Sequence, residues 1–313
     1  MGPTSSPPRL KLIAGNAHPA LAAGVARELG VAVEPAEVGA FADGETRVQI
    51  QAAVRGETVV IVQPTATPVN ENLMVLALLA DAARAAGAAR VVAAVPYFGY
   101  ARQERRGRDG DPRSAQVAAR LLAAAGVDHL LTLDLHAPAL ESAFPMPATL
   151  LGAEEVFLPR VREWGLKDLV VVSPDAGGLK RAQRYASALA AGLAVIAKER
   201  PGPDQAEQRA VLGDVKGRPC LVVDDMASTG RTLAGAAEAL RRAGAGEARA
   251  LFTHAVMAPG AAERIAAAGF ARVVTTDTVP AEISAGVEVL SAAPLLARAV
   301  ASVCGGGQGE IGV

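Results

Sequence analysis

The sequence has few cysteines and almost no excess charge. Its two cysteines, Cys220 and Cys304, lie far apart without metal-ligand or redox spacing, so a disulfide framework is not expected and a reducing compartment is favoured. The 31 basic and 32 acidic residues leave a net charge of -1, and no run of like charge is long enough to follow a nucleic-acid backbone. A disulfide-stabilised secreted protein and a general nucleic-acid binder are therefore disfavoured.

Long apolar runs are also missing. The longest apolar stretches, such as 73–80, are interrupted by Asp81 and Arg84 before they reach the roughly 20 residues that a membrane-spanning helix needs. The first residues, MGPTSSPPRL, lack the apolar central region of a secretory signal. We therefore expect a cytoplasmic protein that has neither a membrane nor a nucleic acid as its partner.

What the chain does contain is enough apolar sequence for a large core. It has 313 residues, of which 51% are hydrophobic and 20% are charged, and this length corresponds to about two domains. Apolar β-branched runs alternate with Ala/Leu-rich stretches of helical period, a pattern typical of parallel strands joined by crossover helices. We expect strands at 10–14, 58–63, 90–96, 129–135, 169–173, 194–197, 219–224, 248–255 and 272–275. We expect helices at 70–86, 113–125, 180–190, 231–243, 261–268 and 293–303.

The sequence suggests a domain boundary near Pro147. Residues 141–153 contain two prolines and show no clear periodicity, so we expect an N-terminal domain at 1–147 and a C-terminal domain at 148–303. The glycine-rich tail, 304–313, is expected to be disordered.

The most informative segment is CLVVDDMASTGRTL at 220–233. An apolar strand ends there in Asp224 and Asp225, and a Ser-Thr-Gly-Arg-Thr turn at 228–232 opens a helix. The free N–H groups of a helix start, a glycine and several hydroxyl groups together suit a phosphate, while two adjacent carboxylates suit vicinal hydroxyls or a divalent cation. The segment therefore predicts a sugar-phosphate site beyond the carboxyl end of a parallel strand. The alternative is an ordinary capped helix after a buried strand.

This loop resembles the PRPP-binding loop of type I phosphoribosyltransferases and, more closely, that of the ribose-phosphate pyrophosphokinase (PRPP synthetase) family. Six further segments resemble that family in the same order and extend the likeness over roughly 10–300: FADGETRVQI at 41–50, PYFGYARQERR at 96–106, LDLHAPALESAF at 133–144, VSPDAGGLKRA at 172–182, the stretch 198–200 and GDVKGR at 213–218.

The resemblance implies a fold and an activity. The fold is α/β, with two similar phosphoribosyltransferase-like domains, each a mostly parallel sheet flanked by helices. The activity is transfer of the diphosphoryl group of ATP to the C1 hydroxyl of ribose 5-phosphate, giving PRPP and AMP, with Mg2+ as cofactor. It also implies self-association into a homo-oligomer with a dimer as its unit, or a hexamer.

Site residues follow from the matched motifs. The resemblance assigns ribose 5-phosphate binding to Arg200, Asp224, Asp225, Ser228, Thr229, Gly230, Arg231 and Thr232. It assigns ATP binding to Phe41, Asp43, Gly44, Glu45, Arg102 and Gln103, with the loop at 41–45 reaching the adenine from a neighbouring subunit. Without the resemblance, Asp43-Gly44 is a common hairpin turn and 102–108 is a solvated surface.

Metal and catalytic roles are implied in the same way. His136 and Asp175 match the family's Mg2+ positions, although Mg2+ prefers oxygen ligands, and either residue alone is as well explained as a polar group at a strand end. Lys198 and Arg200 match its catalytic cations, at the head of a polar stretch suited to closing over a substrate. By composition alone that stretch is a surface turn.

Two departures from the family pattern leave questions open. Ser228 stands where bacterial members usually have Asp, and Arg231 stands where they have a small residue. The segment after Arg106 also differs from the usual regulatory loop, which puts inhibition by ADP and activation by phosphate in doubt. The alternatives to an active pyrophosphokinase are a phosphoribosyltransferase that uses PRPP and a non-catalytic regulatory paralogue.

Overall fold

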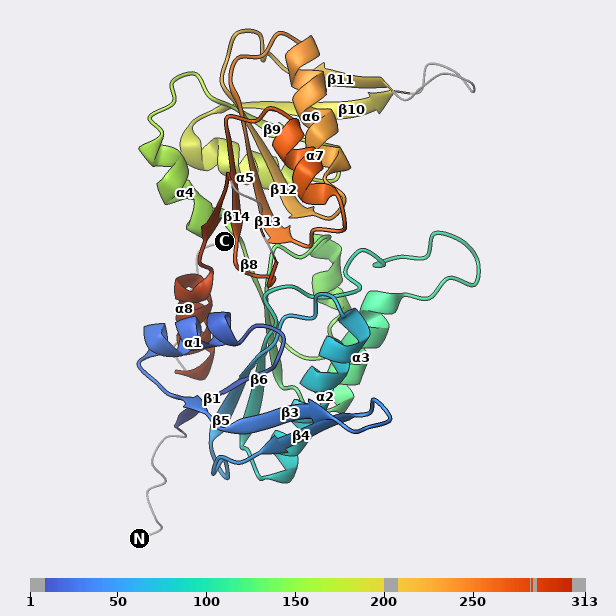
Figure 1. The fold of residues 1–313 in the computed structure, drawn as a ribbon, viewed down its shortest axis with the longest axis vertical. Helices are drawn as coiled ribbons and strands as arrows, with labels where there is room; N and C mark the ends of the chain where they lie inside the picture. Colours follow the sequence, from blue (N-terminus) through green and yellow to red (C-terminus); the bar gives the residue numbers. More distant parts are fainter. Residues whose placement is uncertain (1–8, 200–207, 282, 284–285, 306–313) are drawn as a thin grey trace. The chain divides into compact units, whose positions relative to one another are not determined.

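The computed structural model describes residues 9–199, 208–281, 283 and 286–305. The chain divides into two compact units, one made of 1–151 and 292–313 and the other of 152–291 (Figure 1). No helix in the described ranges combines the length and the apolar character that crossing a bilayer requires.

The first unit contains a six-stranded parallel sheet in the order β2-β1-β5-β6-β7-β8. Every residue of the central strand β5 is buried, as expected where helices cover both faces of a parallel sheet. Helices α2 and α3 cover one face, and α1 and α8 contact each other on the opposite face (Figure 1). A separate antiparallel hairpin, β3–β4, packs against α2. The bounds are β1 Leu10–Ala14, α1 Pro19–Leu29, β2 Val33–Glu34, β3 Ala36–Ala40, β4 Thr46–Ile50, β5 Thr58–Val62, α2 Val69–Ala85, β6 Arg90–Ala94, α3 Ser114–Ala124, β7 His129–Leu133, β8 Ala148–Leu151 and α8 Ala293–Cys304.

The second unit contains a seven-stranded sheet in the order β11-β10-β9-β12-β13-β14-β15. All neighbours are parallel except β11, which runs antiparallel to β10 at one edge. Residues of α4 and α5 pack on one face of the sheet, and residues of α6 and α7 pack on the other. The bounds are α4 Glu154–Glu163, β9 Val170–Ser173, α5 Leu179–Leu189, β10 Gly192–Glu199, β11 Gln208–Leu212, β12 Cys220–Ala227, α6 Arg231–Arg242, β13 Ala248–Ala255, α7 Ala261–Ala267, β14 Arg272–Thr276 and β15 Val287–Leu290.

The predicted fold class, α/β with two mostly parallel sheets flanked by helices, is confirmed. Each of the predicted strands and helices occurs within a few residues of its expected place. β7 ends at Leu133, two residues early, because Asp134 turns the chain with a φ of 32°. The elements that the sequence did not predict are α1, β2, β3, β4, β8, α4, β11, β15 and a 3-10 segment at Pro138–Ala143.

The division between the units differs from the expected one at both ends. β8, at 148–151, pairs with β7 and so completes the sheet of the first unit. Helix α8 also belongs to the first unit, since Arg90 donates a hydrogen bond to the carbonyl of Val303 at 2.7 Å. The second unit is thus an insertion between β8 and α8, and not the whole C-terminal half. The predicted disordered tail begins inside α8 with Cys304, and its residues 306–313 lie outside the described ranges.

Candidate functional site

Two adjacent carboxylates lie near the carboxyl end of β12, which continues past them to Ala227. The first four residues of this strand are fully apolar and buried, and they fix β12 between β9 and β13 in the middle of the sheet. Asp224 and Asp225 follow, and each side chain is no more than 13% exposed. Asp224 Oδ1 also accepts a hydrogen bond from the N–H of Asp225 at 2.9 Å. The sheet therefore holds both acids in fixed positions, as the sugar-phosphate prediction requires.

Arg181 pairs with both of these carboxylates. Its Nη1 lies 3.6 Å from Asp224 Oδ1 and 3.6 Å from Asp225 Oδ1, and its side chain is 10% exposed. It sits in the first turn of α5, one turn before the buried Tyr185, so it lies on the face of the helix that meets the sheet. The sequence analysis did not single out Arg181. The available signal was an arginine at a buried position of an amphipathic helix, which needs an acidic partner.

The surroundings of Asp224 raise its proton affinity. Burial raises the pKa of Asp224 well above its usual range, the neighbouring Asp225 raises it further, and Arg181 opposes the change. Asp175 adds to the rise through its charge, so it belongs to the same carboxylate cluster. Asp175 is held by its own turn, because its Oδ1 accepts from the N–H of Gly178 at 3.0 Å and its carbonyl accepts from Ser173 Oγ at 2.6 Å. A polyhydroxylated ligand would find several acceptors here, with one buried cation among them.

The loop at 228–230, between β12 and α6, is tied down on one side by the segment after β13. The carbonyls of Ala227 and Ser228 accept hydrogen bonds from the N–H groups of Met257 and Ala258 at 3.0 and 2.8 Å. The carbonyl of Thr229 accepts from the guanidinium of Arg264 on α7. Peptide groups are planar and trans, so the N–H groups that follow these carbonyls point the opposite way, out of the loop. Successive outward N–H groups at the start of a 12-residue helix are suited to binding an anion.

Gly230 is required in this loop for two reasons. Its φ of 71° is in the left-handed region, which residues with a Cβ adopt at a cost. A Cβ added there would also lie 2.9 Å from the carbonyl oxygen of Ala261 and 3.0 Å from Cγ1 of Ile265. The glycine therefore lets α7 approach the loop closely. Ser228, Thr229, Arg231 and Thr232 surround it, partly or fully exposed, so the structure brings together the residues predicted around the phosphate.

Of the two predicted catalytic cations, the structure describes the backbone of Lys198 but not Arg200. The backbone of Lys198 belongs to β10 and pairs in register with that of Arg209 on β11. Arg200 lies outside the described residues, as does most of the polar stretch at 199–209 that is expected to close over a substrate.

In the first unit, the predicted adenine loop is the tip of a hairpin. Phe41 and Glu45 close the turn between β3 and β4, with the N–H of Phe41 donating to the carbonyl of Glu45 at 2.8 Å. Asp43 accepts from the N–H of Glu45 at 3.1 Å, and Gly44 has a φ of 95°. The turn expected from Asp43-Gly44 is therefore present. Phe41 is 54% exposed at this tip, and the guanidinium carbon of Arg47 lies 6.0 Å from the centroid of its ring.

The other predicted ATP residues lie in the loop before α3. Arg102 is exposed, and Gln103 is fixed by the start of the helix, since Ser114 Oγ donates to Gln103 Oε1 at 2.5 Å. His136 is exposed after β7 in the first unit, whereas Asp175 lies in the second unit. Among the described residues, no group of three or more His, Cys, Asp or Glu side chains is arranged to hold a metal ion.

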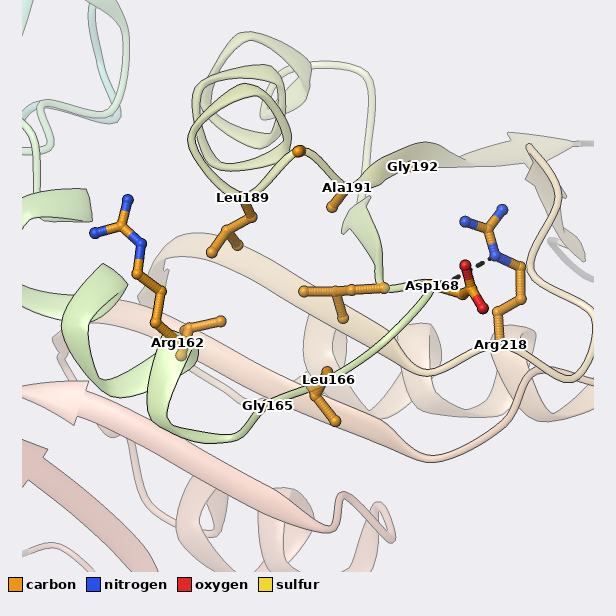
Figure 2. A pocket seen from close by; sticks show the side chains of 11 residues that line it. Arg162, Gly165, Leu166, Asp168, Leu189, Ala191, Gly192 and Arg218 are labelled. Carbon is orange, nitrogen blue, oxygen red and sulfur yellow. Dashed lines mark hydrogen bonds between the residues drawn. The ribbon is translucent and has the colours of Figure 1, made fainter.

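A pocket of about 320 Å³ lies at the opposite, amino-terminal end of the second sheet (Figure 2). It is lined by residues around the starts of β9 and β10, including Leu166, Leu189 and Arg218. Its two arginines bind backbone carbonyls: Arg218 donates to Asp168 at 3.1 Å, and Arg162 donates to Ala188 at 3.3 Å. Ligands of parallel sheets bind beyond the carboxyl ends of the strands. We therefore assign the substrate site to the Asp224 end and not to this pocket.

Comparison with known proteins agrees with this geometry. Residues 10–126 match the family model described as the N-terminal domain of ribose phosphate pyrophosphokinase, and residues 144–280 match the phosphoribosyl transferase domain. Ribose-phosphate pyrophosphokinase from Ralstonia nicotianae is 44% identical over 294 residues, covering 92% of this chain and 93% of the relative. The same enzyme from Burkholderia pseudomallei is 43% identical over 299 residues and covers 94% of each chain.

A solved structure shows the same likeness in three dimensions. The crystal structure of phosphoribosylpyrophosphate synthetase from Mycobacterium smegmatis superposes with a TM-score of 0.90 at 37% sequence identity, covering 96% of this chain and 100% of that one. Both family models and the relatives span nearly the whole chain and include the site described above. The chain belongs to the ribose-phosphate pyrophosphokinase family.

Proposed function

We propose that this chain is an active ribose-phosphate pyrophosphokinase. It transfers the β,γ-diphosphoryl group of ATP to the C1 hydroxyl of ribose 5-phosphate, and the products are PRPP and AMP. The observation that carries the proposal is the loop at 228–230, whose carbonyls are tied to the segment 257–264 next to two buried carboxylates. Membership of the family indicates the reaction, and the loop at 228–230 is the proposed binding site of the sugar phosphate.

Ribose 5-phosphate is held at both of its polar ends in this proposal. The outward N–H groups of the loop and the hydroxyls of Ser228, Thr229 and Thr232 bind the 5-phosphate, with Arg231 as an added cation. Asp224 and Asp225 accept hydrogen bonds from the ribose hydroxyls. Arg181 holds the two acids in place and offsets their repulsion. A rigid sugar in turn fixes the position of its C1 hydroxyl.

ATP is bound by residues of the first unit. The exposed ring of Phe41 stacks on the adenine, while Asp43, Gly44 and Glu45 supply polar contacts at the same hairpin tip. Arg102 and Gln103 contact the nucleotide phosphates, a task for which a guanidinium fork is well suited. The resemblance places the hairpin of one subunit at the nucleotide of its neighbour, so the proposal includes a homo-oligomer.

The transfer itself depends on positioning and charge. The C1 oxygen forms a bond to the β-phosphorus while the bond from that phosphorus to the α,β-bridging oxygen breaks, and AMP leaves in line with the attack. Lys198 and Arg200 are the proposed cations on the transferred group. The hydroxyl of ribose gives up its proton in the same step, and the described side chains offer no single obvious base for it.

Mg2+ fits part of the proposed donor set. Asp175 offers the carboxylate oxygen that Mg2+ prefers, and the phosphates of ATP offer more, whereas the imidazole of His136 is a less favoured ligand. Because Mg2+ prefers oxygen ligands, we propose that the substrate completes the metal site and that His136 contributes through water. When bound, Mg2+ neutralises charge on the diphosphoryl group.

Product identification by phosphorus NMR tests the proposal. With ATP, Mg2+ and ribose 5-phosphate, the protein should produce AMP and PRPP together, and ATP alone should stay intact. Formation of ADP would indicate simple kinase activity, and absence of AMP would refute the proposed reaction. A phosphoribosyltransferase would instead consume PRPP with a base, an alternative that the match to the pyrophosphokinase N-terminal domain disfavours. The cytoplasm, where ATP is plentiful, is the proposed location.

A further inference from the structure

We infer that Arg264 is a positioning residue for the phosphate of ribose 5-phosphate, acting by holding the carbonyl of Thr229. Its guanidinium reaches from α7 to the loop before α6 and donates to that carbonyl. The inference rests on the proposed function and extends it to a residue outside every motif discussed above.

The peptide between Thr229 and Gly230 is the one that most needs an anchor. A glycine accepts both signs of φ, so the peptide group before it rotates at little cost. One rotation exchanges the directions of the carbonyl and the N–H, and would place a partial negative charge where the phosphate binds. Ala227 and Ser228 have their carbonyls held by backbone N–H groups at 3.0 and 2.8 Å, whereas the Thr229 carbonyl depends on a side chain.

Arg264 is itself placed by the core. Its helix is fixed through Ile265, which is 1% exposed within the apolar cluster of the sheet, and through the buried Ala261. The N–H of Arg264 donates to the carbonyl of Gly260 at 3.3 Å, which starts the helix next to the loop. The guanidinium is partly exposed and adds a positive charge beside the phosphate loop. The role assigned here is orientation of the peptide, and the charge is a secondary contribution.

Arg241 offers a matched control. It also donates from a guanidinium to a backbone carbonyl between α6 and α7, to Ala268 at 3.0 Å, but from the last turn of α6, far along the helix from Gly230. Arg241→Met should therefore disturb the contact between the two helices as much as Arg264→Met, without affecting the peptide at the phosphate loop.

The test compares calorimetric binding of ribose 5-phosphate and steady-state kinetics in the full-length variants. We expect Arg264→Met to raise the Kd and KM for ribose 5-phosphate about tenfold, equivalent to ~1.4 kcal/mol, with kcat and the KM for ATP within about twofold. Arg264→Lys keeps the charge without the planar fork and should restore binding only in part.

Three results would overturn the inference. An unchanged Kd for ribose 5-phosphate in Arg264→Met would refute the inference. A normal Kd in Arg264→Lys would show that only the charge of residue 264 matters. An equal loss in Arg241→Met would show that helix packing alone is responsible. Failure of the wild-type protein to form AMP would count against the proposed function, while the binding comparison would still test Arg264.

Discussion

The guanidinium of Arg181 and the carboxylate of Asp224 form a buried ion pair at 3.6 Å between the first turn of α5 and the end of β12. The same guanidinium reaches Asp225 at 3.6 Å, so one cation serves two adjacent acids. The pair joins two distant segments at the point where the ribose hydroxyls are proposed to bind.

Removing Arg181 should destabilise the protein in a pH-dependent way. We expect Arg181→Met to lose about 3 kcal/mol of unfolding free energy at pH 8, because two buried carboxylates lose their counter-charge. The folded pKa of Asp224 already lies above its unfolded value, so its contribution to stability is lost as pH rises through the folded pKa. The loss should therefore be smaller at pH 5 than at pH 8 in urea unfolding curves.

A second variant separates charge from packing. The double variant Arg181→Met with Asp224→Asn removes one acid together with the cation, and it should recover most of the stability at pH 8. The same deficit at both pH values, without recovery in the double variant, would contradict the electrostatic account.

Gly230 and Gly244 provide a matched pair of alanine substitutions. Their φ values are 71° and 72°, so each Gly→Ala change should cost about 1 kcal/mol of stability from backbone strain alone. Only at Gly230 does the added methyl group meet backbone, at 2.9 Å, whereas at Gly244 the nearest atom is Cγ of Lys216 at 3.7 Å. Gly230→Ala should raise the KM for ribose 5-phosphate about tenfold or more. An equal increase of this KM in Gly244→Ala would show that the effect is not specific to the loop at 228–230.

Phe41 should contribute to ATP binding and not to stability. Its ring is 54% exposed, so Phe41→Ala should leave the melting temperature unchanged. Loss of stacking on the adenine should raise the KM for ATP about tenfold, since stacking of a base on an aromatic ring is worth about 1–3 kcal/mol. Val289→Ala, at a site that is 44% exposed on β15, serves as a control. A normal KM for ATP in Phe41→Ala would exclude the hairpin from the nucleotide site.

Lys198 should act on turnover more than on binding. Lys198→Ala is expected to lower kcat by about 10²–10³-fold, the usual cost of removing one group that stabilises charge in the transition state. Calorimetric affinity for ribose 5-phosphate should stay within about twofold. Lys167→Ala, an exposed lysine before β9, is the control. Weak binding with normal turnover would assign Lys198 a different role.

The acids of β12 and the loop at 228–230 were predictable because they are contiguous in sequence. An apolar strand, two acids and a Ser-Thr-Gly turn follow one another, and each has a local physical meaning that the fold preserves. Arg181 and Arg264 were not predictable in the same way. Their partners lie 43 and 35 positions away in the chain, and only the packing of α5 and α7 on the sheet brings them together.

The missed strands have a related cause. β3 and β4 have five residues each, so the alternation of Val48 and Ile50 with the exposed Arg47 and Gln49 is short, and 41–50 is interpreted through its resemblance to a ligand-binding loop. β8 and β15 have four residues each and are mostly half-buried, so they lack the fully buried apolar run that identifies the equally short β9. The helix α8 was predicted, but an apolar helix does not show in its own sequence which sheet it will cover.

The position of α8 also affects how the chain acquires its structure. Gly24 lets α1 approach the start of α8 closely, because a Cβ added at Gly24 would lie 3.0 Å from the Cβ of Ala293. During synthesis the strands of the first unit emerge before α8, so α1 keeps part of its apolar face uncovered until α8 leaves the ribosome. The inserted second unit can close on itself before then. A truncation before Ala293 should therefore destabilise the first unit before the second, although α8 follows the second unit in the sequence.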